Sequence, residues 1–231
     1  MARHRQPVLA HQRFVAREHE LKDLQPRELF TEIWRSNLWG ADKSRSGLGS
    51  EADATSQLAA ELPKLLRQFG IRTLLDLPCG DFGWLARTKL ELDTYLGADI
   101  VAELVELNTA KHATFDGRVG FRRLDLLSDP LPAMDAVLCR DCLVHLSLAN
   151  IARAFANLKT SGSRWLIATT FTDHDDNRDI VDGDWRLLNL QAEPFNLPPP
   201  AALLNEGCSE AGGTYDDKSL GVWRIADLPL V

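Results

Sequence analysis

The chain has 231 residues, of which 45% are hydrophobic, and a formal net charge of −7 at pH 7. This length and composition suit one α/β domain with a sizeable core. No apolar run approaches the roughly 18 residues that a membrane-spanning helix needs, and the negative charge disfavours a general nucleic-acid binder. With no secretory signal expected and four cysteines expected as reduced thiols, we expect a cytoplasmic protein.

The first 50 residues differ in charge from the rest of the chain. They carry 9 Lys and Arg against 6 Asp and Glu, whereas the remainder carries 17 against 27. Residues 1–25 are polar and are predicted to form a flexible, solvated arm, with an RNA-contacting arm as the alternative. We expect residues 26–231 to form a single domain, with residues 26–70 as a helical cap.

Two helices are predicted before the first strand. Leu29 and Ile33 follow helical spacing within residues 26–39, and Gly40 ends that helix. A small polar loop at residues 44–50 follows. A second helix is predicted at about residues 54–69, where Pro63 indicates a kink or a later start.

The first strand and the turn after it are the most informative stretch. The apolar run 71–75 predicts a buried parallel strand, and it leads into Asp76-Leu77-Pro78-Cys79-Gly80-Asp81-Phe82-Gly83. A glycine in such a turn lets the backbone approach a ligand closely. Gly80 and Gly83 alone do not make the three-glycine dinucleotide fingerprint, and the lysine of a phosphate-binding P-loop is absent.

Strand and helix patterns then alternate to the end of the chain. Strands are predicted at residues 94–100, 120–125, 135–140, 164–171 and 220–225, helices at 101–112 and 148–158, and a loop at the Pro-rich stretch 194–200. Strands separated by helices of this size predict βαβ units and a mostly parallel sheet. Ligands of such sheets bind outside the carboxyl ends of the strands. The charged residues there should converge: Asp76, Asp81, Asp99, Asp125, Arg140 and Asp141.

The turn at residues 76–83 resembles motif I of the class I S-adenosylmethionine (SAM) methyltransferases, and the resemblance covers roughly residues 44–175. It implies a Rossmann-like α/β fold: a seven-stranded, mostly parallel sheet with one antiparallel strand near the C-terminus and N-terminal capping helices. It also implies SAM as the cofactor. The positions implied to bind it are Ser46, Gly47, Ser50, Asp76, Cys79, Gly80, Asp81, Asp99, Ile100, Asp125, Leu126 and Arg140.

Within that set, the resemblance gives three positions specific roles. Asp99 would accept hydrogen bonds from the ribose hydroxyls, with a helix N-cap as the alternative. Asp125 would contact the adenine amino group with Leu126 packed on the ring, or would be an ordinary turn residue. The loop containing Ser46, Gly47 and Ser50 would cover the methionine end of SAM, or would be a plain linker.

Asp141 and His145 follow the strand 135–140 and are the predicted catalytic pair. Their spacing of four places them together on a helical turn. His145 suits a general base because its imidazole titrates near neutrality, and Asp141 would position the acceptor or a metal ion. A packing role for His145 is the alternative. The absence of an Asn-Pro-Pro-Tyr or Asp-Pro-Pro-Tyr motif disfavours the DNA and protein amide N-methylating branch.

The segment after the strand 164–171 supplies the acceptor hypothesis. Asp173 and Asp175, with Asp141 opposite, offer the oxygen donors that Mg²⁺ prefers, in a manner similar to metal-dependent sugar O-methyltransferases. Trp185 would stack on a sugar and Arg186 would hydrogen-bond it. A solvated acidic loop and simple lid packing are the alternatives.

Together these patterns predict a SAM-dependent O-methyltransferase that acts on a hydroxyl of a small acceptor, with a saccharide first, through His145 as base. Mg²⁺ is a second cofactor to test, and a homodimer is left open. An RNA methyltransferase that uses the basic arm and a non-catalytic SAM-binding protein are the alternatives.

Overall fold

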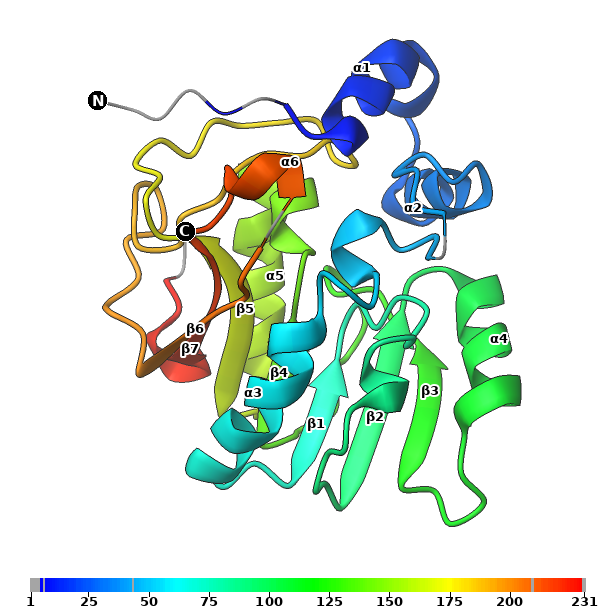
Figure 1. Cartoon of the computed structure of the whole chain (residues 1–231), viewed down its shortest axis with the longest axis vertical. Coiled ribbons are helices and arrows are strands. Elements are labelled where there is room, and N and C mark those ends of the chain that lie inside the picture. Colours follow the sequence, from blue (N-terminus) through cyan, green and yellow to red (C-terminus); the bar gives the residue numbers. More distant parts are fainter. Residues whose placement is uncertain (1–4, 6, 43, 209, 230–231) are drawn as a thin grey trace.

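The computed structural model describes residues 5, 7–42, 44–208 and 210–229, and a seven-stranded sheet forms its centre (Figure 1). The strand order is β3-β2-β1-β4-β5-β7-β6. The strands are β1 (Thr73–Asp76), β2 (Thr94–Asp99), β3 (Val119–Arg123), β4 (Ala136–Cys139), β5 (Trp165–Phe171), β6 (Ala202–Asn205) and β7 (Lys218–Arg224). The first five strands pair in parallel, and β7 is antiparallel to β5 and β6. The predicted mostly parallel sheet with one antiparallel strand is confirmed.

Helices cover both faces of this sheet. On one face, α3 (Ser56–Gln68) packs through Leu58 and Leu62 on Leu74 of β1. On the other face, α5 (Leu148–Thr160) packs through Ile151 and other apolar residues on Leu75, the next residue of β1. Successive strand residues therefore point to opposite covered faces, which explains why the central strands read as continuous apolar runs. Figure 1 shows α3 in front of the sheet and α5 behind it.

The remaining elements connect the strands or close the edges. A helix, α4 (Ala102–His112), packs against β2 and β3. The shorter elements are α6 (Glu210–Gly213) and the 3-10 helices η1 (Leu48–Ser50), η2 (Leu85–Arg87), η3 (Leu143–His145) and η4 (Ile225–Asp227). The strand β6, which follows the Pro-rich loop, was not predicted because its four residues lie at the sheet edge with alternating burial. Among the described residues, no helix is long and apolar enough to cross a membrane.

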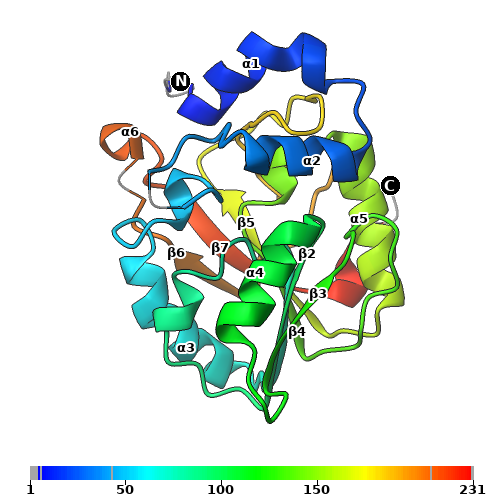
Figure 2. The same cartoon turned by 90° about the vertical axis from the view of Figure 1, so that its right-hand side faces the viewer.

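Two N-terminal helices, α1 (Leu9–Leu21) and α2 (Pro26–Arg35), lie together beyond the carboxyl ends of the parallel strands (Figures 1 and 2). Phe14 and Leu21 of α1 are buried against Leu29 and Ile33 of α2. The prediction of a flexible arm over residues 1–25 is therefore wrong for residues 9–21, whose apolar residues seven apart bury one helix face. Residues 1–4 and 6 of that arm lie outside the described residues.

The predicted helical cap of residues 26–70 divides into two parts. The helix α2 lies over the strand ends, whereas α3 lies on the face of the sheet and belongs to its core. The helix α3 begins at Ser56 and continues through Pro63 as one element. The loop between α2 and α3 is the part that reaches the strand ends, so it is the loop that contributes to the site.

Candidate functional site

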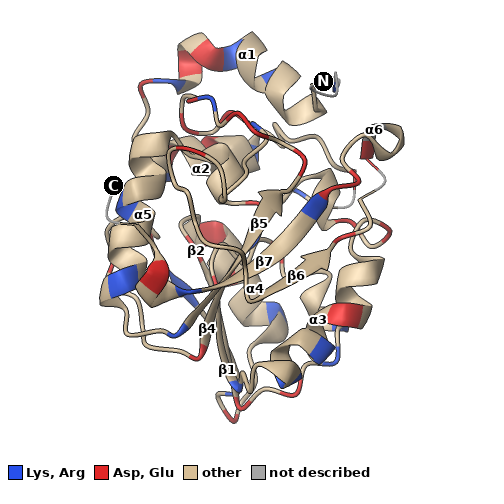
Figure 3. Ribbon diagram, turned by 90° about the vertical axis from the view of Figure 1, so that its left-hand side faces the viewer, with Lys and Arg blue, Asp and Glu red and all other residues tan. Residues whose placement is uncertain are grey.

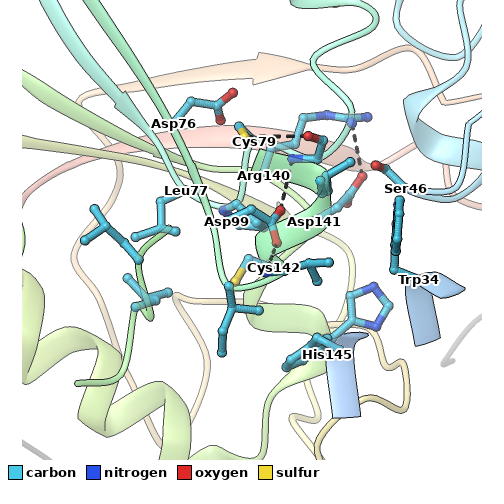
Figure 4. Close-up of a pocket in the computed structure, with 18 of the residues that line it drawn as sticks. Trp34, Ser46, Asp76, Leu77, Cys79, Asp99, Arg140, Asp141, Cys142 and His145 are labelled. Atoms are coloured by element: carbon cyan, nitrogen blue, oxygen red, sulfur yellow. Dashed lines mark hydrogen bonds and ion pairs between the residues drawn. The ribbon is translucent and has the colours of Figure 1, made fainter. Parts of the chain in front are cut away.

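A cavity opens at the carboxyl ends of β1, β2 and β4, and we call it the first cavity. Figure 4 shows Asp76 on one side of this space, and Ser46 and His145 on the other. Most of the predicted site residues line it. They are Ser46, Ser50, Asp76, Cys79, Gly80, Asp99, Ile100, Asp125, Leu126, Arg140, Asp141 and His145.

The turn after β1 and the loop 44–50 form one wall of the first cavity. Gly80 has a φ of 53°, which disfavours other residues. A Cβ built on Gly80 would lie 2.6 Å from Ser46 Oγ, and the Asp81 amide donates a hydrogen bond to the same oxygen at 3.0 Å. A side chain at position 80 would therefore push the loop away from the turn.

Asp76 and Asp99 end β1 and β2, and both residues are buried, with 3% and 6% of their surface exposed. Tyr95 Oη donates to Asp76 Oδ2 at 2.6 Å, and burial raises the pKa of Asp76 to about 7. Asp99 accepts from the Gly80 amide at 3.2 Å and from the Val101 amide at 3.0 Å. Burial raises the pKa of Asp99 to about 6, and these amide hydrogen bonds oppose the rise.

The far end of the first cavity is apolar. Ile100, Leu104, Leu124, Leu126 and Leu127 line it. The Asp125 carboxylate also faces this cavity. Within its own turn it accepts hydrogen bonds from the Leu127 amide and from Ser128 Oγ, both at 2.8 Å.

A largely buried ion-pair network lies at the opposite end, where Arg140 and Asp141 follow β4, Lys218 begins β7 and Glu206 follows β6. Arg140 Nη2 donates to Glu206 Oε2 at 2.6 Å and to the Gly49 carbonyl at 2.8 Å. Lys218 Nζ lies 2.7 Å from Asp141 Oδ2 and 3.5 Å from Glu206 Oε2. Burial alone would raise the pKa of Asp141, but Lys218 and Arg140 hold it well below its usual range. Asp141 is therefore ionised at every physiological pH.

Glu206 and Lys218 were missed in the sequence because they lie more than 60 residues beyond Arg140. Lys218 begins β7 and Glu206 follows β6, the unpredicted edge strand. The available signal was a lysine two residues before the mostly apolar run 220–223, a position where burial requires an opposite charge. No motif at either position identifies its partner.

His145 ends the short helix η3 and faces the first cavity beside Asp141 (Figure 4). Its Nδ1 lies 2.8 Å from the Asp184 carbonyl oxygen. Because a carbonyl only accepts, the neutral ring carries its proton on Nδ1 and keeps the lone pair on Nε2. The Trp39 ring stacks on His145 with centroids 4.6 Å apart. Burial lowers the pKa of His145 to about 4, so the imidazole is neutral at pH 7.

A second cavity adjoins the first, beneath the start of α1. It is lined by Trp185 and Gly47, both predicted site residues, and by Phe171, Cys208, Glu210, Tyr215 and Lys218, among others. The rings of Phe171, Trp185 and Tyr215 pack edge-on with centroids 5.5 to 6.1 Å apart. Four residues line both cavities, namely Trp39, Ser46, Asp141 and His145. The two spaces therefore meet at the predicted catalytic pair.

The predicted magnesium site is wrong. The part of the chain that the structure describes holds no group of three or more His, Cys, Asp or Glu residues arranged for a metal ion. Asp141 is paired with Lys218, whereas Asp173 and Asp175 are exposed and line neither cavity. The ammonium of Lys218 already supplies the positive charge beside Asp141 that the metal would have brought.

Two other predicted site residues point elsewhere. Arg186, which is 1% exposed, lines neither cavity, and its Nη1 donates to the carbonyls of Leu143 and Val144, both at 3.2 Å. It therefore positions the η3 turn that carries His145 and does not face an acceptor. Asp81 accepts from the Gly83 amide at 3.0 Å and closes its own turn outside both cavities.

No protein-family model and no curated protein sequence matches the chain. Solved structures do match. The methyltransferase domain of bacterial CtHen1-C is 13% identical with a TM-score of 0.54, over 73% of this chain and 96% of that one. PH0226 from Pyrococcus horikoshii OT3 is 17% identical with a TM-score of 0.51, over 76% of this chain and 92% of that one. The chain has the Rossmann-like α/β fold of class I methyltransferases.

Proposed function

We propose that the protein is a SAM-dependent methyltransferase, with SAM in the first cavity and a small hydroxylated acceptor, a saccharide first, in the second. The observation that carries the proposal is the meeting of the two cavities at Trp39, Ser46, Asp141 and His145. A methyl group passes from donor to acceptor only where the two touch. Among the described residues, His145 is the histidine that lines both cavities, and its imidazole is buried and neutral, which supports a role where donor and acceptor would touch.

The residues of the first cavity suit SAM. Asp99 would accept from the ribose hydroxyls, and Ile100 and Leu126 would pack on the adenine. Asp76 and Asp99 are costly to ionise in their buried positions, and a ligand that carries positive charge and hydrogen-bond donors offsets that cost. SAM, when bound, supplies a methyl group on a sulfonium sulfur. The thioether that leaves when the methyl group is transferred needs no activation by the protein.

His145 would act as the general base for the acceptor. A hydroxyl must lose its proton as its oxygen forms the bond to the methyl carbon, and the lone pair on His145 Nε2 is available to take that proton. The Nδ1–H bond to the Asp184 carbonyl fixes the tautomer. The negative charge of Asp141 favours the protonated ring, which then releases its proton to solvent when the product leaves.

The second cavity supports a small acceptor with a ring. Trp185 lines it next to Phe171 and Tyr215, and aromatic side chains of this kind pack against the faces of sugars and other rings. The acceptor's hydroxyl would point toward His145, where the cavities meet.

Calorimetric titration with SAM, followed by a labelled-methyl transfer screen over sugars, phenols, amines and RNA, tests the proposal. We expect SAM to bind and label to appear on a hydroxylated small molecule. Failure of SAM to bind the purified protein would reject the proposal as a whole. Label on amines alone would reject hydroxyl methylation and leave the donor assignment standing.

A further inference from the structure

A described segment near the N-terminus covers the second cavity. We call Arg5 and residues 7–10 the N-terminal strap. Pro7, Val8, Leu9 and Ala10 line the second cavity opposite the residues of β7 and the loop after β5. Figure 1 shows the residues directly before α1 above that loop. The strap and the loop are therefore two sides of one space.

A buried ion pair holds the free end of the strap. Arg5 Nη1 and Nη2 donate to Asp217 Oδ1 and Oδ2 at 2.5 and 3.0 Å, and the two side chains are 5% and 2% exposed. The guanidinium also lies 5.8 Å from the centre of the Tyr215 ring, which lines the second cavity. A two-pronged pair of this geometry fixes orientation as well as distance.

The other end of the strap continues into α1, which is held separately. His11 Nδ1 lies 2.7 Å from Asp184 Oδ1, in the loop after β5 that carries several acidic positions beneath α1 (Figure 3). A Cβ built on Gly183 would lie 3.0 Å from Phe14 of α1, so the helix and this loop are in close contact. The strap thus spans the cavity between two fixed points.

Both fixed points adjoin the place where the cavities meet. Asp217 directly precedes Lys218, whose ammonium pairs with Asp141. Asp184, which binds His11 through its side chain, accepts the Nδ1 proton of His145 through its backbone carbonyl. The strap is therefore attached to the residues next to the proposed catalytic pair.

We propose that the N-terminal strap is a wall of the acceptor site, that Arg5 is the residue that holds it closed, and that the acceptor is consequently a small molecule enclosed beneath it. This inference rests on the proposed function. Arg5 forms an ion pair with Asp217 inside the molecule, so its positive charge is not available to bind RNA. A polymer such as RNA would reach His145 through the second cavity only after the strap was displaced.

Cys208 provides a direct measurement without knowledge of the acceptor. It lines the second cavity and is 8% exposed. We would measure its alkylation rate by N-ethylmaleimide with mass spectrometry, in the wild type, in Arg5→Ala and in a chain that lacks residues 1–8. We expect roughly tenfold faster alkylation of Cys208 in both variants, because loss of the ion pair increases local opening. The rates of Cys79 and Cys139, which are buried elsewhere, should not change.

Two further variants separate the ion pair from general effects. Arg5→Lys retains the positive charge and should restore most of the protection of Cys208. Arg17→Ala removes the ion pairs of Arg17 with Glu20 and Glu32, which lie nearer the surface. In this variant Cys208 should be alkylated at the wild-type rate. Equal Cys208 rates in the wild type, Arg5→Ala and the shortened chain would overturn the proposal. A parallel rise of all four cysteines would overturn it too, because it would indicate general unfolding.

SAM binding keeps this test independent of the proposed function. The strap lines only the second cavity, so Arg5→Ala should bind SAM as the wild type does. If the wild type fails to bind SAM, the proposed function fails, whereas the alkylation rates still report on the strap. Methyl transfer to RNA that is lost in Arg5→Ala would overturn the enclosed acceptor site.

Discussion

The two cavities are built from different parts of the chain. The first cavity consists mainly of strand ends and the segments that follow β1, β2, β3 and β4, which are close in sequence to predicted strands, together with residues of α2 and of the loop after it. The second cavity combines the N-terminal strap, the loop after β5 and the start of β7, which are far apart in sequence. The comparison teaches that a donor site can follow from the fold, whereas an acceptor site depends on contacts particular to one chain.

The largest expected effect is at the residue that belongs to both cavities. His145→Ala should lower turnover by roughly 10²–10⁴-fold if the imidazole is the base, and the affinity for SAM should stay within about threefold. Labelled-methyl transfer and calorimetry on the same preparation measure the two quantities. An unchanged rate would show that His145 only packs against Trp39. The place where the two cavities meet would then have no general base at position 145.

The network behind the second cavity should matter for folding. Lys218→Met leaves Asp141 and Glu206 without their ammonium partner, and breaking a buried pair costs about 3–5 kcal/mol of unfolding free energy. Urea unfolding measures the change. In the double variant with Asp141→Asn, part of the loss should be recovered because one buried charge is removed with its partner. Single-variant stability equal to the wild type would show that the network contributes nothing to the fold.

A comparison of two aspartates, Asp99 at the end of β2 and Asp81 in the turn after β1, tests the assignment of SAM to the first cavity. Asp99→Ala should weaken SAM binding by roughly 100-fold through lost charge-assisted hydrogen bonds. Asp81→Ala is the matched control, because its carboxylate serves the Gly83 amide within its own turn. We expect SAM affinity within about threefold of the wild type there. Calorimetry that shows Asp81→Ala to be as damaging as Asp99→Ala would contradict the geometry of the cavity.

The features that could be predicted from the sequence are those of the first cavity, and the features that could not are contacts between distant segments. The strands and their terminal acids were accessible because hydrophobic runs and turns are local signals. The pairing of Arg140 with Glu206 and of Arg5 with Asp217 was not, because ion pairs between distant segments leave no local pattern. The magnesium site was predicted wrongly for this reason. In the sequence Asp141 has no visible partner, whereas in the structure Lys218 pairs with it.

The predictions for residues 1–25 and for Arg186 were wrong for a related reason. Polar composition predicted a mobile arm, but Phe14 and Leu21 are enough to bury α1 against α2. Arg186 follows Trp185 and was assigned with it to the acceptor, but adjacent residues of an irregular loop point in different directions. Only the hydrogen bonds to Leu143 and Val144 reveal that Arg186 supports η3.

The smallest expected effect is a pH dependence that belongs to the first cavity alone. In the free protein the pKa of Asp99 is about 6 and that of Asp76 about 7, both raised by burial above the ordinary value of 3.8. These groups favour the folded state most below pH 4, and that contribution is lost as the pH rises through 6 and 7. SAM, with its positive charge, favours the ionised carboxylates. Its affinity should therefore rise roughly tenfold between pH 5.5 and pH 8.

The predicted catalytic pair, which lines both cavities, should not titrate in that range. Lys218 and Arg140 keep the pKa of Asp141 far below it, and burial keeps the pKa of His145 at about 4, so both groups hold one protonation state from pH 5.5 to pH 8. Turnover at saturating SAM should accordingly be flat over this interval, while the SAM dissociation constant changes. Asp99→Asn should reduce the change in affinity and leave the part that Asp76 contributes. A dissociation constant that is independent of pH, with turnover that rises instead, would reverse the assignment, because the titrating groups would then lie beside the acceptor.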